Sequence, residues 1–149
     1  MYPTIDPKIH YDAQAFANKV VLITGASRGI GAQIALQYAL AGASLSLVAR
    51  TQSALDASKD AILRELPSAK VLTFPTDVRD VRRAAEVVAA TVSNFGRLDI
   101  LIANAGILRP MDKRALCPPT RIVTAIFVAD LCRALSICVE GSERMVGCP

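Results

Sequence analysis

Three glycines that directly follow an apolar run are the residues of this chain best placed to do chemistry. Gly25, Gly29 and Gly31 come after the strand-forming residues 19–24, in the order Thr-Gly-x-x-x-Gly-x-Gly, and a helical spacing of apolar residues begins at once. Glycine adopts backbone angles that other residues resist, and it lets the main chain approach a phosphate closely. A helix that begins there presents unpaired N–H groups and the positive end of its dipole to an anion. The stretch therefore predicts a site for the phosphates of a nucleotide.

Two arginines indicate which nucleotide this site prefers. Arg50 ends a second apolar run, where this topology meets the adenosine ribose, and no acid follows it before Asp56. An arginine at that position favours a 2′-phosphate, whereas a carboxylate would bind a free 2′-hydroxyl. Arg28, inside the glycine turn, adds a second positive charge on the same side. Each arginine alone could simply be solvated, but the pair predicts NADP(H) in preference to NAD(H).

The elements that must position these residues alternate between strand and helix patterns. Strands are expected at residues 19–24, 44–49, 70–74 and 98–103. Helices are expected at about residues 30–41, 53–66 and 79–95. In the first helix the spacing predicts a core face of Ile30, Ile34, Tyr38 and Ala41, and in the third one of Val81, Ala85, Val88, Val92 and Phe95. Short links between such elements require right-handed crossovers and a parallel sheet.

Three motifs at these separations resemble those of the short-chain dehydrogenase/reductase family. They are the glycine turn, Asp77-Val78 after the third strand and Asn104-Ala105-Gly106 after the fourth, and the resemblance covers about residues 18–108. It implies that the pyrophosphate and ribose of the cofactor are wrapped by Gly25, Ser27, Arg28, Gly29, Ile30 and Gly31. It implies that Arg50 holds the 2′-phosphate and that Asp77 and Val78 meet the adenine ring. It also implies that the far ribose is lined, and the central sheet braced, by Asn104, Ala105 and Gly106, and that Asp99 is structural.

The predicted fold class is α/β, a Rossmann-like doubly wound parallel sheet that is truncated after the fourth strand and followed by an atypical C-terminal tail. Residues 1–18 are expected to be an extended N-terminal lead-in, and residues 19–108 the NADP(H)-binding domain. Residues 109–149 form the tail, which holds all four cysteines. One helix is expected over residues 120–140, although the β-branched residues 122–124 leave a strand as an alternative. The cysteine spacing matches no metal-binding or redox motif, so we expect no metal site.

The catalytic residues of the family have no match in this chain. The family uses a Tyr-x-x-x-Lys pair with a Ser and an Asn; the Tyr moves the substrate proton, and the Lys lowers the pKa of that Tyr. The tyrosines here are Tyr2, Tyr11 and Tyr38, and four positions later stand Asp6, Ala15 and Gly42. We therefore assign no catalytic residue and expect Tyr38 to pack in the core.

Composition argues against several kinds of partner. The net charge is +4, but the basic residues are scattered, whereas a nucleic-acid surface needs a clustered basic face. The most apolar window, residues 122–139, is interrupted by Asp130 and Arg133, which argues against a membrane span. The first residues lack the apolar core of a secretory signal. We therefore expect a cytoplasmic protein.

Three functional hypotheses follow. The first is an NADP-dependent oxidoreductase that transfers hydride between the nicotinamide and a small carbonyl or alcohol substrate; that substrate would bind only if the missing half were supplied. The second is a catalytically silent nucleotide-binding or interaction module. The third is a truncated or mis-spliced product, because proline and cysteine usage shifts after about Asp112. The substrate identity and the oligomeric state stay open.

Overall fold

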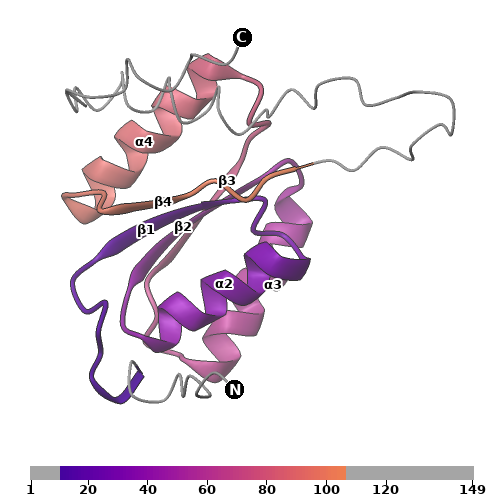
Figure 1. Cartoon of the computed structure of the whole chain (residues 1–149). Helices are drawn as coiled ribbons and strands as arrows, with labels where there is room; N and C mark the ends of the chain where they lie inside the picture. The colour runs from indigo at the N-terminus through magenta and orange to yellow at the C-terminus, as the bar shows by residue number, and fades with distance from the viewer. Residues whose placement is uncertain (1–10, 107–149) are drawn as a thin grey trace, which may run out of the picture.

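The computed structural model describes residues 11–106, which form a four-stranded parallel sheet with helices on both faces (Figure 1). The strands are β1 (Val20–Thr24), β2 (Ser44–Ala49), β3 (Val71–Pro75) and β4 (Ile100–Ile102). The helices are α2 (Gly29–Leu40), α3 (Gln52–Glu65) and α4 (Val81–Phe95). The strand order β3-β2-β1-β4 confirms the predicted Rossmann-like α/β class. The predictions made for residues 107–149 lie outside the described residues.

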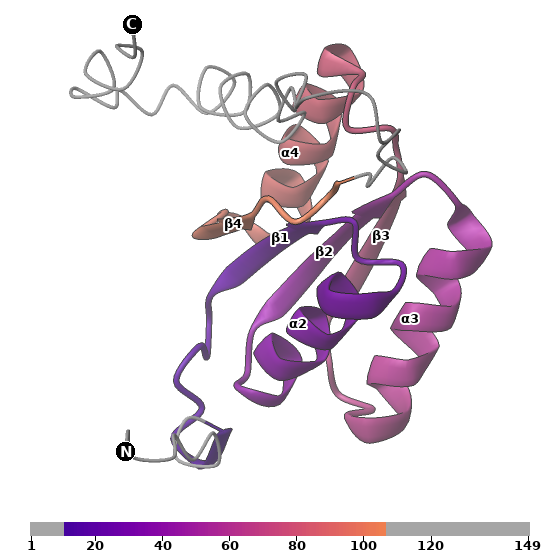
Figure 2. The same ribbon diagram turned by 45° about the vertical axis from the view of Figure 1, so that its right-hand side comes forward.

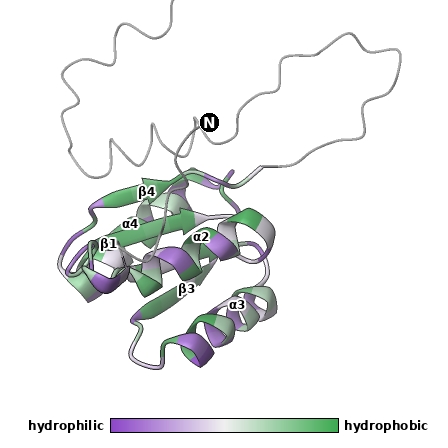
Figure 3. Cartoon of the chain, turned by 60° about the horizontal axis from the view of Figure 1, so that its bottom comes forward, coloured by the Kyte–Doolittle hydropathy of each residue, from purple (hydrophilic) through white to green (hydrophobic). Residues whose placement is uncertain are grey.

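The strands read as continuous apolar runs because the sheet is covered on both sides. Helices α2 and α3 lie on one face and α4 on the other, as the turned view also shows (Figure 2). Val21 and Ile23 belong to the cluster under α2 and α3, whereas Leu22 between them belongs to the cluster under α4. Coloured by hydropathy, the strands are mostly hydrophobic, while α3 carries hydrophilic residues as well (Figure 3). Among residues 11–106, no helix is long and apolar enough to cross a membrane.

The predicted core face of α2 is confirmed in part: Ala41 is buried and Ile34 is half-buried against the core, but Ile30 is not part of it. Ile30 is 73% exposed, and the buried residues of this helix are Gly31, Ala35 and Ala39. Small side chains let the helix lie close to the sheet, so the larger residues beside them stay half-buried. Tyr38 is one of these, and it packs against the cluster under α2 and α3.

The core face of α4 is likewise turned from the predicted one. Its buried residues are Ala84, Val87, Val88 and Thr91. Val88 was predicted correctly and Val92 packs half-buried against the same cluster, whereas Val81 is 45% exposed and Ala85 is exposed as well. The cause is that apolar residues stand at neighbouring helical positions, so the spacing fits more than one face.

Residues 11–12 are helical and residues 13–18 form turns, instead of the expected extended lead-in. The backbone N–H groups of Gln14, Ala17 and Lys19 each donate to the carbonyl oxygen three residues earlier. The N–H of Phe16 donates to the carbonyl oxygen of Ala41, at 2.9 Å. This segment is therefore folded against the end of α2.

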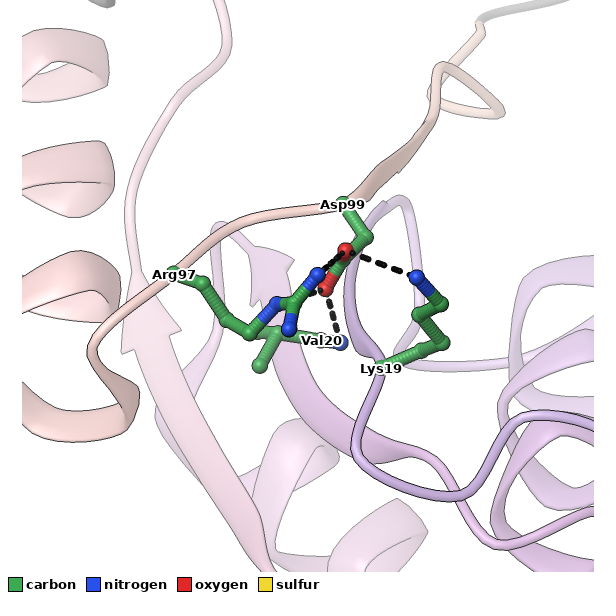
Figure 4. A network of polar contacts seen from close by, with 4 residues as sticks. All are labelled: Lys19, Val20, Arg97 and Asp99. Atoms are coloured by element: carbon green, nitrogen blue, oxygen red, sulfur yellow. Dashed lines mark hydrogen bonds and ion pairs between the residues drawn. The ribbon is translucent and has the colours of Figure 1, made fainter.

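A network around Asp99 ties the starts of β1 and β4 together (Figure 4). One carboxylate oxygen of Asp99 accepts the backbone N–H of Val20 at 2.9 Å, and the other lies 3.4 Å from Nζ of Lys19. Arg97 donates to both oxygens, through Nε at 2.8 Å and through Nη2. The Arg97 hydrogen bonds are the largest of the influences that lower the pKa of Asp99 to about 2. This geometry agrees with the structural role that the resemblance implied for Asp99.

Candidate functional site

The predicted site residues meet at one edge of the sheet because all four strands run parallel. We call this the carboxyl edge; it is formed by the ends of β1 to β4. The N–H of Gly25 donates to the carbonyl oxygen of Val48, and the N–H of Thr76 to that of Ala49, each at 2.8 Å. The glycine turn, Arg50 and Asp77 therefore follow three neighbouring strands. Asn104 follows β4, on the other side of β1.

Two glycines of the turn are required by contacts inside the protein. A Cβ atom at Gly31 would lie 2.3 Å from the carbonyl oxygen of Gly25 and 2.5 Å from Nδ2 of Asn104. Gly25 has a φ of +68°, and its Cβ would lie 2.9 Å from Cα of Ala105. These positions accept no side chain because the main chain of the β1–α2 turn lies directly against the end of β4.

Gly29 is different, because the space beside it is open. Its φ is +58°, and no atom of the described residues lies within 4 Å of the position a Cβ would take. The left-handed backbone requires glycine here. The open space leaves the main chain approachable from outside, as a phosphate site needs.

The start of α2 also fits an anion. Its N-cap is Arg28, whose backbone is extended and whose side chain makes no capping hydrogen bond, and the first turn holds no acid. In α4, by contrast, the N-cap Asp80 accepts the N–H of Arg83 at 3.2 Å. The first N–H groups of α2 and the positive end of its dipole therefore stay available to a bound anion.

Thr24 belongs to the site, although it is absent from the predicted set. Its buried hydroxyl accepts the N–H groups of Asn104 at 3.1 Å and Ala105 at 3.0 Å, and lies 3.4 Å from the carbonyl oxygen of Ile102. In return, Nδ2 of Asn104 donates to the carbonyl oxygens of Thr24 at 3.1 Å and Gly25 at 3.3 Å. The glycine turn is thus held to the end of β4. The signal was present, since Thr24 directly precedes the first glycine.

Asp77 is bound by Arg79, a second residue that the sequence analysis left out. Oδ1 of Asp77 accepts the backbone N–H and Nε of Arg79, each at 3.0 Å. Oδ2 accepts Nε at 3.1 Å and Nη2 at 2.6 Å. The pKa of Asp77 is lowered to about 2, mainly by the hydrogen bonds from Arg79 and to a smaller extent by the charge of Arg50. The carboxylate is therefore ionised and fixed in direction.

Arg50 is exposed, and it makes no hydrogen bond or ion pair with any residue between 11 and 106. Its charge nevertheless reaches Asp77. Arg28 is exposed as well. Both predicted cations can therefore reach a ligand at the carboxyl edge.

The other predicted residues lie around the same edge with different exposures. Ile30 is exposed on the first turn of α2, and Ser27 is half-buried in the turn before it. Val78 is half-buried against the cluster under α4. Ala105 is half-buried and Gly106 exposed. These positions leave Ile30 and Gly106 accessible from outside.

The two tyrosines within residues 11–106 lie at the C-terminal end of α2, away from the glycine turn. Tyr38 lies in the last turn and contacts Phe16 edge to face, with ring centroids 4.8 Å apart. The hydroxyl of Tyr11 donates to Oε1 of Gln37. At about 1.5 Å per residue, this end lies roughly 13 Å along the helix from the glycine turn. Within residues 11–106, no three His, Cys, Asp or Glu side chains are grouped to hold a metal ion.

Comparison with known proteins gives one consistent result. The family model described as short chain dehydrogenase matches residues 19–146. Levodione reductase of Leifsonia aquatica is 46% identical over 92 residues, which are 62% of this chain and 34% of that protein. The 11-beta-hydroxysteroid dehydrogenase 1A of Arabidopsis thaliana is 49% identical over 88 residues, which are 59% of this chain and 25% of that protein. The matched part thus spans about a third or less of these relatives.

Among solved structures, a similar one is L-sorbose reductase from Gluconobacter frateurii, complexed with NADPH and L-sorbose. It superimposes with a TM-score of 0.68 at 29% identity, over 80% of this chain and 46% of that chain.

Proposed function

This chain belongs to the short chain dehydrogenase family, and from that premise we propose that residues 19–108 bind NADP(H) along the carboxyl edge of the sheet. The observation that carries the proposal is the convergence of three features there. The main chain at Gly29 is open, the start of α2 is uncapped, and Arg50 has no partner within the described residues. The L-sorbose reductase complexed with NADPH supports the same choice of cofactor.

Each part of the cofactor is assigned to a separate group of residues. The pyrophosphate and its adjoining ribose are assigned to Gly25, Ser27, Arg28, Gly29, Ile30 and Gly31. The 2′-phosphate is assigned to Arg50, which can form charge-assisted hydrogen bonds with it. The adenine ring is assigned to Asp77 and Val78, and the far ribose to Asn104, Ala105 and Gly106.

The family reaction is hydride transfer between the nicotinamide and a carbonyl or alcohol substrate; the bound cofactor would donate the hydride to a carbonyl or accept it from an alcohol. This chain's own residues hold the nucleotide: Thr24 and Asn104 keep the glycine turn in place, and Asp77 offers an acceptor. Tyr11 and Tyr38 lie at the far end of α2, where Tyr11 binds Gln37 and Tyr38 packs against Phe16. We propose that neither moves a substrate proton.

A second candidate is a nucleotide-binding module without turnover. The observation that favours it is that no tyrosine of the chain has a lysine four positions later. Mixing the chain with NADPH and a panel of small carbonyl compounds separates the two candidates. Oxidation of NADPH above the background rate would support the enzyme, and binding without oxidation would support the module.

Cofactor binding is tested by calorimetric titration of the whole chain with NADPH and with NADH. We expect tighter binding of NADPH, and Arg50→Ala should weaken it by about tenfold, the effect of removing a hydrogen bond to a charged group. Arg64→Ala is the matched control, since it removes an equal charge from the last turn of α3. Equal affinity for the two cofactors, or no binding of either, would overturn the proposal.

A further inference from the structure

Arg79 is a residue to which neither the motifs nor the proposed function give a role. It is 67% exposed, yet its backbone and side chain both bind the carboxylate of Asp77. We propose that Arg79 is a positioning residue that determines cofactor specificity: by binding Asp77, it keeps the Arg50 guanidinium available for the 2′-phosphate of NADP(H). This inference rests on the proposed function, because it concerns the same site.

The first step of the argument is the placement of Arg50 and Asp77. Arg50 directly follows β2, and Asp77 comes two residues after β3, its parallel neighbour. The Thr76 N–H binds the Ala49 carbonyl oxygen at 2.8 Å, so the main chains before the two side chains are hydrogen-bonded. Arg50 is also close enough for its charge to act on Asp77. A carboxylate without another partner would therefore attract Arg50.

The second step is that Arg79 already donates hydrogen bonds to both oxygens of this carboxylate. An Arg–carboxylate pair with two parallel hydrogen bonds is stronger and more directional than a single contact. Arg79 needs little ordering to form the pair, because it is only two residues away and its own N–H binds Oδ1. Arg50 would have to displace it to reach Asp77. The guanidinium of Arg50 consequently stays free of Asp77.

The third step is that the pair still leaves Asp77 able to bind adenine. A carboxylate has about four acceptor positions. The four contacts from Arg79 use three protons, since the single Nε proton is shared between Oδ1 at 3.0 Å and Oδ2 at 3.1 Å. The Asp77 side chain is 30% exposed, so the amino group of the adenine ring can reach a carboxylate oxygen and take the place of one half of the shared Nε–H contact. Asp77 can therefore bind both Arg79 and the cofactor.

The test is the ratio of the dissociation constants of NADH and NADPH, measured by titration for each variant. We expect Arg79→Ala to lower this ratio about threefold to fivefold, because Arg50 must then leave an exposed ion pair before it binds the phosphate. Arg83→Ala is the matched control: Arg83 is also 67% exposed and also forms an ion pair, with Glu86. If Arg83→Ala lowers the ratio equally, net charge explains the effect and the proposal is wrong.

A second variant distinguishes positioning from a direct contact. Asp77→Asn in the Arg79→Ala background removes the carboxylate that would capture Arg50, so the ratio should return to near the wild-type value. Asp77→Asn alone should weaken the binding of both cofactors through the adenine contact, and it should not lower the ratio. If the double variant keeps the low ratio, Arg79 itself contacts the phosphate and the positioning role is refuted.

The two proposals fail in different ways. A wild-type chain that binds neither cofactor, or both equally, overturns the NADP(H) assignment. A wild-type chain that prefers NADPH, together with an Arg79→Ala variant that keeps the full preference, leaves that assignment intact and overturns the role of Arg79. Because Arg79 and Arg83 are exposed, both variants should keep the wild-type melting temperature, which checks that the fold is unchanged.

Discussion

Gly31 and Gly29 stand two residues apart, yet they are glycines for different physical reasons, and alanine substitutions should separate the two. In a helix, Gly→Ala ordinarily stabilises by about 1 kcal/mol. At Gly31 the new Cβ would lie 2.3 Å from the Gly25 carbonyl oxygen, and overpacking of this kind costs about 1–3 kcal/mol or more. The steric term dominates, because the obstacle is backbone. We predict that Gly31→Ala lowers the free energy of unfolding by about 2 kcal/mol or more.

Gly29→Ala should destabilise the fold for a different reason. Its Cβ would meet no described atom, so only the left-handed φ of +58° is unfavourable, at about 1–2 kcal/mol. Urea denaturation of both variants measures the difference. A loss at Gly31→Ala no larger than that at Gly29→Ala would show that small shifts relieve the close contact with the Gly25 carbonyl oxygen, and the steric explanation for Gly31 would be wrong.

The residues that sequence reasoning missed act through other protein groups. The Thr24 hydroxyl serves Asn104 and Ala105, which lie about 80 positions further along the chain, and the role of Arg79 depends on the direction of one carboxylate. A motif shows which residue types stand at a spacing, but it does not show which hydroxyl a distant strand end will approach. The glycines were easier to identify, because their requirement is local.

At the scale of elements, the order and type of all seven described elements could be predicted, because the strand and helix periods alternate with clear breaks. The faces of the helices were harder. Ile30 and Val81 fitted the predicted stripes by spacing, but they are 73% and 45% exposed. The sheet instead accepts Ala35, Ala39 and Ala84, and even the hydroxyl of Thr91, which lies 3.0 Å from that of Ser46. Short side chains, which let a helix lie close to the sheet, were therefore buried in preference to the large apolar ones.

The stability that Asp99 adds to the pairing of β1 with β4 should depend on pH. Its pKa is lowered from 3.8 to about 2 in the folded chain. A lowered pKa stabilises the fold above the unfolded value, and this contribution is lost as the pH falls from about 4 through 2. We predict that Asp99→Asn costs about 1 kcal/mol at neutral pH, since hydrogen bonds from Val20, Lys19 and Arg97 weaken.

The pH series supplies the control for this prediction. The difference in unfolding free energy between wild type and Asp99→Asn should shrink as the pH is lowered from about 4 toward 2, because the wild-type carboxylate then becomes neutral. Asp77 titrates in the same range, but it is present in both proteins and cancels in the comparison. A difference that stays constant across this range would mean that the charge of Asp99 contributes nothing.

On the scale of the whole molecule, the parallel sheet makes one site from segments that are far apart in the chain. The glycine turn, Arg50, Asp77 and Asn104 follow four different strands, and parallel strands place all their carboxyl ends at the same edge. The Asp99 network lies at the opposite ends of β1 and β4 (Figure 4). The Asp99 network and the proposed binding edge are therefore separated across the sheet, so Asp99 can be changed without disturbing that edge.

This separation predicts a pattern of amide hydrogen exchange. A cofactor that spans the carboxyl edge must stabilise the four strand ends together, by an amount that grows with its concentration. We predict that NADPH slows exchange at residues 25–31, 50–51, 76–78 and 104–106, while residues 97–100 change little. NADH should protect residues 50–51 less than NADPH does, because it lacks the 2′-phosphate assigned to Arg50. Protection confined to the glycine turn would contradict a ligand that crosses all four ends, even if the chain binds NADPH.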